Sequence, residues 1–180
     1  MTRKTWLIAV ALAAIAASIA VPVAASAGGA TFGFHATQIQ GFRTGVVALS
    51  GGGAFDPTTG VAHLSGGFSC VQDVAQGPLT GCRAGEGVRW DTANLLRSTT
   101  FKCTGAASEA LKPAATGPTT AVVQADFYRA GDGNDESFTA QMIVSQDDIA
   151  PDLPGVQHVW VQGVGCGSAV GSFNAGGSAG

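Results

Sequence analysis

Glycine is the feature that most constrains the fold of this 180-residue chain. All 27 glycines follow residue 27, where they make up about 18 % of the remaining chain, against a usual share of about 7 %. Each glycine inside a helix costs roughly 1 kcal/mol relative to alanine. Long helices are therefore excluded over most of the chain after residue 27.

Between the glycines and prolines, apolar and polar residues alternate with a period of two, which is typical of half-buried strands. Phe32 and Phe34 lie on one parity of the first such run. Residues 46–55 and 61–71 predict a hairpin, because Pro57 presets a turn and Gly60 can take a positive φ. Further strands are expected at residues 99–104, 121–129, 138–145 and 159–165.

The segment at residues 72–98 is the least regular part of the pattern. Asp91 is expected to cap a short helical turn over residues 92–97, and a second turn is expected at 108–112 before Pro113. The sequence thus predicts one all-β domain of about seven antiparallel strands, a β-sandwich or a barrel-like fold, over residues 28–166. A flexible Gly/Ser/Ala tail is expected over residues 167–180.

Residues 1–27 have the organisation of a signal peptide. Arg3 and Lys4 precede an apolar run, and Ala25-Ser26-Ala27 forms a small-x-small cleavage site. The run is about 16 residues long, shorter than the roughly 20 needed to span a bilayer. We expect cleavage after Ala27, secretion, and no membrane span in the processed protein.

The four cysteines, in a chain predicted to be exported, are expected to form two disulfides. The preferred pairing is Cys70–Cys82 with Cys103–Cys166, and a pairing of Cys70 with Cys103 is nearly as plausible. No C-x-x-C or H-x-x-x-H spacing supports a zinc site. The disulfides are therefore expected to stabilise the domain.

The charge of the chain disfavours nucleic acid as a partner. Without Arg3 and Lys4, seven basic residues remain against 12 acidic ones, a net charge of −5. No basic stripe is left to neutralise a phosphate backbone. Motifs for a serine nucleophile elbow, a zinc-binding helix, a phosphate loop and a dinucleotide fold are also missing from the sequence.

One acidic loop is a candidate calcium site. Asp132, Asn134 and Glu136 place oxygen ligands at alternate positions, which suits a hard cation such as calcium. The same run is ordinary hairpin-turn chemistry, and the full calcium-loop spacing is missing. Asp147, Asp148 and Asp152 could complete such a site.

A second candidate is a ligand platform on one sheet face. If the last three predicted strands form a meander, polar and aromatic side chains gather on the face opposite Phe127. Aromatic rings beside amides and a carboxylate suit sugar rings, although any half-solvated strand gives the same pattern. The platform residues are Gln124, Asp126, Tyr128, Gln141 and Trp160, with His158 and Gln162 beside them. Burying Cys166 on this parity would require a bulge at Gly163 or Gly165.

The sequence Arg89-Trp90-Asp91 is the third candidate, in which Arg89 stacks on Trp90 or pairs with Asp91 to pin an irregular loop. His35 and His63 are expected to be ordinary solvent-side strand residues.

Three stretches resemble a group of uncharacterised secreted proteins of actinomycete bacteria. They are GVVALSGGGAFDPTTGVAHLSGGF, AGEGVRWDTANLL and FYRAGDGNDESFTAQMIVSQDDIAPDLPGVQHVWVQGVGCG. The resemblance covers nearly all of the predicted mature chain, and it implies export without implying any enzymatic activity.

The sequence is most consistent with a secreted, non-enzymatic binding or interaction module of the cell envelope or extracellular space. Its partner would be a protein or a glycan, and no cofactor other than calcium is expected. Two alternatives remain open. One is a structural, self-associating envelope protein, and the other is a small secreted hydrolase or isomerase that uses Asp126, Glu136 or His158.

Overall fold

The computed structural model describes residues 29–129 and 137–174, and these contain strands but no helix. Residues 1–28, with the predicted signal peptide, lie outside the described part. None of the described residues forms a helix that is long and apolar enough to cross a membrane. The strands are β1 (Ala30–Gly41), β2 (Val46–Asp56), β3 (Val61–Gln72), β4 (Arg89–Leu96), β5 (Ser98–Phe101), β6 (Lys112–Ala115), β7 (Thr120–Tyr128), β8 (Ser137–Ser145), β9 (Val159–Val161), β10 (Gly165–Gly167) and β11 (Val170–Asn174).

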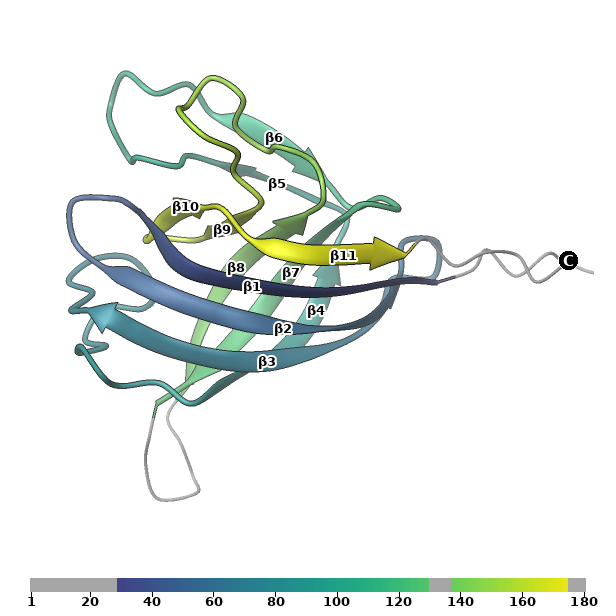
Figure 1. Ribbon diagram of the computed structural model, residues 1–180, viewed down its shortest axis with the longest axis horizontal. Helices are drawn as coiled ribbons and strands as arrows, with labels where there is room; N and C mark the ends of the chain where they lie inside the picture. Colours follow the sequence, from purple (N-terminus) through teal and green to yellow (C-terminus); the bar gives the residue numbers. More distant parts are fainter. Residues whose placement is uncertain (1–28, 130–136, 175–180) are drawn as a thin grey trace, which may run out of the picture.

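Eight of these strands form a closed antiparallel barrel (Figure 1). The order around the barrel is β1-β2-β3-β4-β7-β8-β9-β10, and the Gln40–Cys166 and Gly41–Gly165 pairs close it. The extra strand β11 follows β10 and pairs with the first half of β1. Of the two folds that the sequence left open, the chain adopts the barrel.

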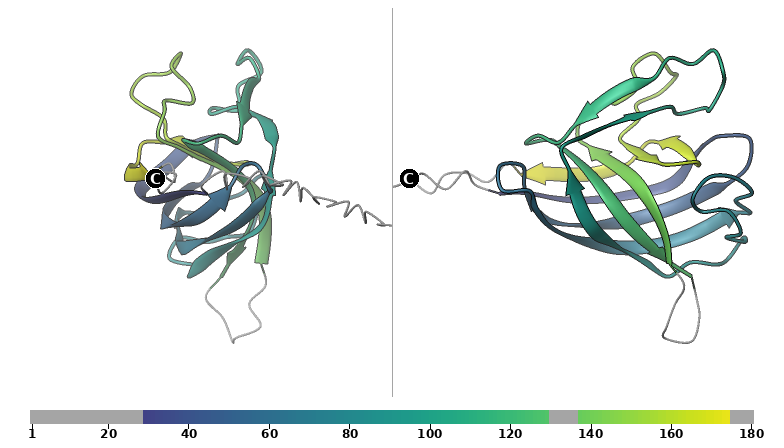
Figure 2. Two further views of the ribbon diagram at one scale, coloured as in Figure 1. Left: turned by 90° about the vertical axis from the view of Figure 1, so that its right-hand side faces the viewer. Right: turned by 180° about the vertical axis from the view of Figure 1, so that it is seen from behind.

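The remaining strands, β5 and β6, form a separate two-stranded sheet outside the barrel (Figure 2). Together with the loop 146–157 they make a cap over the outer side of β8, β9 and β10. Beneath the cap lies a second apolar cluster, in which Phe101 packs on Trp160 with ring centroids 5.5 Å apart. This part of the barrel wall is therefore buried on both sides.

The hairpin of β2 and β3 confirms the clearest prediction made from the sequence. Asp56 ends β2, and its carboxylate accepts the amide of Thr58 at 2.8 Å, which holds its pKa below the usual value. Gly60 has a φ of +76°, as the turn requires. The register then runs without a break from Asp56–Val61 to Val47–Cys70.

The predicted helical turn at Asp91 is wrong, because residues 89–96 form the strand β4. A register shift between Thr92 and Asn94 places both Trp90 and Leu95 against the interior, five positions apart. A regular strand would put residues an odd number apart on opposite faces. The bulge therefore hides the alternation that would have marked a strand.

Two further predictions are corrected at the C-terminal end. The single strand expected at residues 159–165 is two short strands, β9 and β10, joined by a tight turn. The tail expected to be flexible from residue 167 contains β11, in which Phe173 stacks on Phe32 at 5.0 Å between ring centroids. The strand β6, which contains Pro113, was not predicted.

Side chains fill the interior of the barrel. Trp90 is fully buried and lies in one cross-strand row with Gly51, Gly66 and Phe127. Its indole lies against Gly51, and its Nε1 donates to the carbonyl oxygen of Ser50 at 2.9 Å. A Cβ on Gly51 would lie 2.7 Å from the indole, and one on Gly66 would lie 1.8 Å from the Ser50 oxygen. Gly51 is therefore required for the tryptophan to fit, and Gly66 for β3 to lie this close to the β2 backbone.

We predict that Gly66→Ala destabilises the protein by about 3 kcal/mol, because the added methyl group overlaps backbone that cannot move alone. Gly67→Ala is the matched control, since its Cβ would approach only the side-chain hydroxyl of Ser50, at 3.1 Å. It should change stability by no more than about 1 kcal/mol. Urea unfolding measures both, and equal effects of the two substitutions would contradict this packing argument.

The disulfides are Cys70–Cys82 and Cys103–Cys166, the pairing preferred from the sequence. Cys166 faces Trp160 across the β9–β10 hairpin, and both side chains point outward beneath the cap. The bulge expected to turn Cys166 inward is therefore unnecessary, because the cap buries it on the outside of the barrel. Two disulfides are consistent with an extracellular protein.

Replacing both Cys103 and Cys166 by alanine should lower stability by roughly 4 kcal/mol, against roughly 3 kcal/mol for the Cys70/Cys82 pair, because the first crosslink closes the longer loop. Thermal unfolding of the two double variants under oxidising conditions gives the comparison. The opposite order would mean that strain or residual structure, rather than loop entropy, sets these contributions.

Candidate functional site

Four of the five predicted platform residues do share one outer surface. Gln124, Asp126 and Tyr128 alternate along β7, Gln141 lies opposite Gln124 on β8, and all four are half-buried. Figure 2 (right) shows these strands on the side of the barrel seen from behind. We call the outward side of β4, β7 and β8 the β4–β7–β8 face.

Trp160 does not belong to this face, which corrects the platform prediction. Its side chain is 4 % exposed beneath the cap, and its Nε1 donates to the carbonyl oxygen of Lys102 at 2.8 Å. The predicted strand parity was right, but β5 covers the outer surface at that point. The side chain of Gln162, which was expected beside the platform, accepts the backbone amide of Gln141 at 3.1 Å. His158, the other residue expected there, lies next to Ser145 at the end of β8.

Strand β4 adds two charged residues that the sequence analysis did not place on the face. Arg89 lies opposite Tyr128, and Asp91 lies opposite Asp126. The Arg89 guanidinium pairs with Asp91 and stands 4.0 Å above the centre of the Tyr128 ring. Arg89 therefore stacks on Tyr128, and Trp90 between the two charges points into the barrel. The missed bulge in β4 concealed this arrangement.

Asp91 and Asp126 place two carboxylates side by side on neighbouring strands. Like charges directly opposite each other destabilise a sheet unless they are compensated. Arg89 pairs with Asp91, and the hydroxyl of Thr139 donates to Asp126 at 2.7 Å. The second oxygen of each carboxylate, Oδ1 of Asp91 and Oδ2 of Asp126, has no hydrogen-bond partner among residues 29–129 and 137–174, and both residues are half-exposed.

Of the residues proposed for a hydrolase, Asp126 and His158 do not come together. His158 accepts the backbone amide of Ala169 through Nδ1, and its carbonyl oxygen accepts the backbone amide of Ser145 at the end of β8. Asp126 lies opposite Thr139, six residues earlier on that strand. At about 3.3 Å per residue, the two groups are roughly 20 Å apart. Glu136 lies outside the described residues.

The predicted calcium ligands Asp132, Asn134 and Glu136 all lie outside the described residues. Within residues 29–129 and 137–174, no group of three or more His, Cys, Asp or Glu side chains is arranged to hold a metal ion. The aspartates considered as additional ligands have other partners. Asp147 accepts the hydroxyl of Thr119, Asp148 accepts two loop amides, and Asp152 pairs with Lys112.

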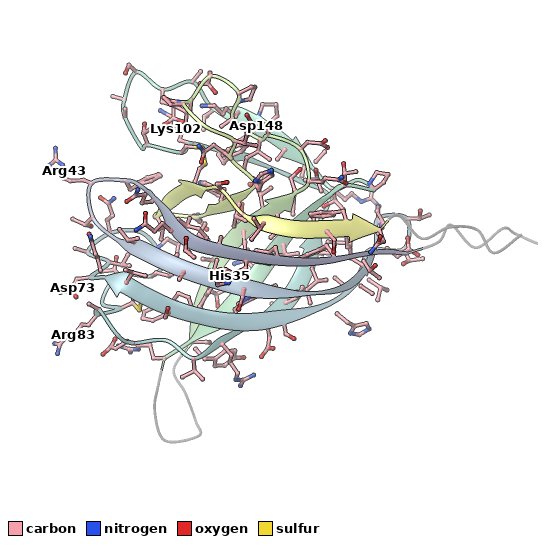
Figure 3. All side chains as sticks on the ribbon, in the orientation of Figure 1. His35, Arg43, Asp73, Arg83, Lys102 and Asp148 are labelled. Atoms are coloured by element: carbon pink, nitrogen blue, oxygen red, sulfur yellow. A yellow bond between two sulfur atoms is a disulfide. The ribbon has the colours of Figure 1, made fainter. Side chains whose placement is uncertain are left out.

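His35 on β1 and His63 on β3 are exposed, as the strand alternation predicted. Figure 3 shows His35 on the side of the barrel formed by β1, β2 and β3. Small residues surround both histidines on the outer surface of β1, β2 and β3. A shallow groove of about 270 Å³ runs beside His35, Ser50 and Gly67. The residues that line this groove include no charged partner for His35.

The cap contains a nearly buried carboxylate. Glu109 is 6 % exposed and accepts the amides of Cys103 and Thr104, the Thr104 hydroxyl and the Lys112 ammonium group. Burial alone would raise its pKa, but these hydrogen bonds outweigh burial and lower the pKa to about 2. Glu109 thereby fixes the backbone next to the Cys103–Cys166 disulfide.

Because the pKa of Glu109 is lowered on folding, its stabilising contribution is present above about pH 4.5 and is lost as the pH falls towards 2. We predict that Glu109→Gln costs about 2–3 kcal/mol at pH 7 and progressively less below pH 4.5. Asp152→Asn is the control, since that side chain is 58 % exposed and its ion pair should contribute at most about 1 kcal/mol. A cost of Glu109→Gln that does not change with pH would contradict the assignment.

No protein-family model, no curated protein and no solved structure matches this chain. The function must therefore be argued from the chemistry of its surfaces.

Proposed function

We propose that this protein is a non-enzymatic extracellular module that binds a polysaccharide on its β4–β7–β8 face. The observation that carries the proposal is the stack of Arg89 on Tyr128 beside the facing carboxylates of Asp91 and Asp126. It places an aromatic and guanidinium surface next to strong hydrogen-bond acceptors on a solvent-facing sheet.

The chemistry of this face suits sugars. Sugar hydroxyls both donate and accept hydrogen bonds. The face offers carboxylate acceptors, together with the side-chain amides of Asn94 and Gln124, which can donate and accept. An aromatic side chain adds apolar contact area beside these polar groups. The antiparallel strands hold these residues in a fixed register, which lowers the entropic cost of binding.

Two features favour binding over catalysis. The barrel interior is filled by side chains such as Trp90 and Phe127 and offers no room for a substrate there. Retaining glycosidases use two carboxyl groups about 5 Å apart. Asp91 and Asp126 lie directly opposite each other on neighbouring strands, where a similar separation is expected. They lie, however, on a half-exposed outer face, where a substrate would not be enclosed and water would not be excluded.

An extracellular setting is supported by the two disulfides and by the signal peptide predicted over residues 1–27. The self-associating alternative would use the outer surface of β1–β3 instead, where Gly33, Gly52 and Ser65 form a low, uncharged row. Sedimentation without any ligand distinguishes that alternative, because it alone requires association of the pure protein.

The test measures binding of the oxidised protein to starch, cellulose, chitin and a β-1,3-glucan. At least one polymer should retain the protein, and Tyr128→Ala or Arg89→Ala should weaken retention about tenfold or more. Tyr128→Phe keeps the ring and should bind nearly as well as the native protein. Arg43→Ala is the matched control, because Arg43 is an exposed arginine on a loop at one end of the barrel (Figure 3).

Three results would overturn the proposal. They are no retention by any of the four polymers, retention that both Tyr128→Ala and Arg89→Ala leave unchanged, and release of soluble sugar that Asp126→Asn abolishes. Circular dichroism melting of each variant separates loss of binding from loss of the fold.

A further inference from the structure

A cleft of about 430 Å³ lies between the cap and the barrel, on the other side of the cap from the β4–β7–β8 face. Its barrel wall is the second half of β1 with Gly167 and Ser168, and its cap wall is Thr104 with the loop around Leu153 and Gln157. The volume is within the range of about 300–1,000 Å³ found for small-molecule sites.

The walls of this cleft are fixed in place. The Cys103–Cys166 disulfide joins cap and barrel among the lining residues. On the cap side, Asp148 accepts the amide of Gln157 at 3.1 Å, and Lys112 bridges Glu109 and Asp152. A preformed site binds without first ordering its own walls.

The lining of the cleft is polar but uncharged. Gln38, Gln40 and Gln157 bring side-chain amides from two different segments, and Thr37 and Ser168 add hydroxyl groups. Within the described part of the chain, the side-chain amides of Gln38 and Gln40 have no hydrogen-bond partner. The side-chain amide of Gln157 donates only to the carbonyl oxygen of Pro154. Each of these groups can donate and accept, as sugar hydroxyls do.

A bound peptide strand fits this cleft less well. The β1 edge at this point is already paired with β10 through Gln40–Cys166 and Gly41–Gly165, so it cannot accept an added strand. No Lys, Arg, Asp or Glu lines the cleft to select a charged ligand. The apolar patch of Leu153 and Pro154 matches the C–H face of a sugar ring.

We infer that this cleft is a second ligand site, which takes one or two residues of a neutral sugar between the glutamines of β1 and Gln157. The inference does not depend on polysaccharide binding at the β4–β7–β8 face. A single small ring with few contacts should bind in the millimolar range.

The test follows the side-chain amide signals of Gln38, Gln40 and Gln157 by ¹⁵N NMR while glucose, galactose, mannose and N-acetylglucosamine are added. We expect at least one of these sugars to shift all three amides, and Gln157→Ala to weaken its binding about tenfold. Gln124→Ala, an equivalent truncation on the β4–β7–β8 face, should leave it unchanged. Glucuronate should bind about tenfold more weakly than glucose, because its carboxylate finds no cation in the cleft.

The inference is overturned if none of the four sugars shifts these amides at concentrations up to about 50 mM. It is also overturned if Gln124→Ala abolishes sugar binding while Gln157→Ala does not, which would place the sugar on the β4–β7–β8 face. Sugar binding in the cleft without retention on any polymer would support this inference and overturn the proposed function alone.

Discussion

The contact that the rest of the barrel depends on is that of Trp90 with the backbone of β2. An indole of this size fits inside an eight-stranded barrel only where the strand that it lies against carries no side chain, and Gly51 provides that space, while Gly66 lets β3 approach the same stretch of β2. The Nε1–Ser50 hydrogen bond then satisfies the one polar atom that the burial creates. The high glycine content is thus a packing requirement of a filled barrel as well as a source of turns.

A filled barrel moves any recognition to the outside, and the cap divides that outside into different surfaces. Under the cap, Trp160 and Phe101 form a second core, so that part of the wall is unavailable to ligands. The rest of the wall keeps its polar side chains at the surface. They are charged on β4 and β7, and on β1 to β3 they are mostly small, with His35, His63 and the glutamines of β1 among them. The edge of the cap adds a concave surface to the convex wall, the cleft of about 430 Å³ beside β1.

The sequence predicted the parts of this fold in which alternation is regular, and it failed where another segment changes what a position faces. The β2–β3 hairpin and the parity of Gln124, Asp126 and Tyr128 follow from local pattern alone. The bulge in β4 shifts that pattern, which hid Arg89 and Asp91 from the candidate site. Trp160 was placed on the correct side of its strand, but only the tertiary position of β5 decides that this side is buried.

The Cys103–Cys166 disulfide links these observations. The cap is a short two-stranded sheet and a loop, and a two-stranded sheet alone is marginally stable in water. Its position on the barrel is held by the disulfide, by the Trp160–Lys102 hydrogen bond and by a hydrogen bond from the Thr99 hydroxyl to the side chain of Gln141 on β8. The first two attachments are adjacent in the chain, at the edge that lines the cleft, and within the cap Glu109 fixes the amides of Cys103 and Thr104 at the same edge. The inferred binding cleft thereby has one wall that is already ordered, which lowers the entropic cost of binding a ligand there.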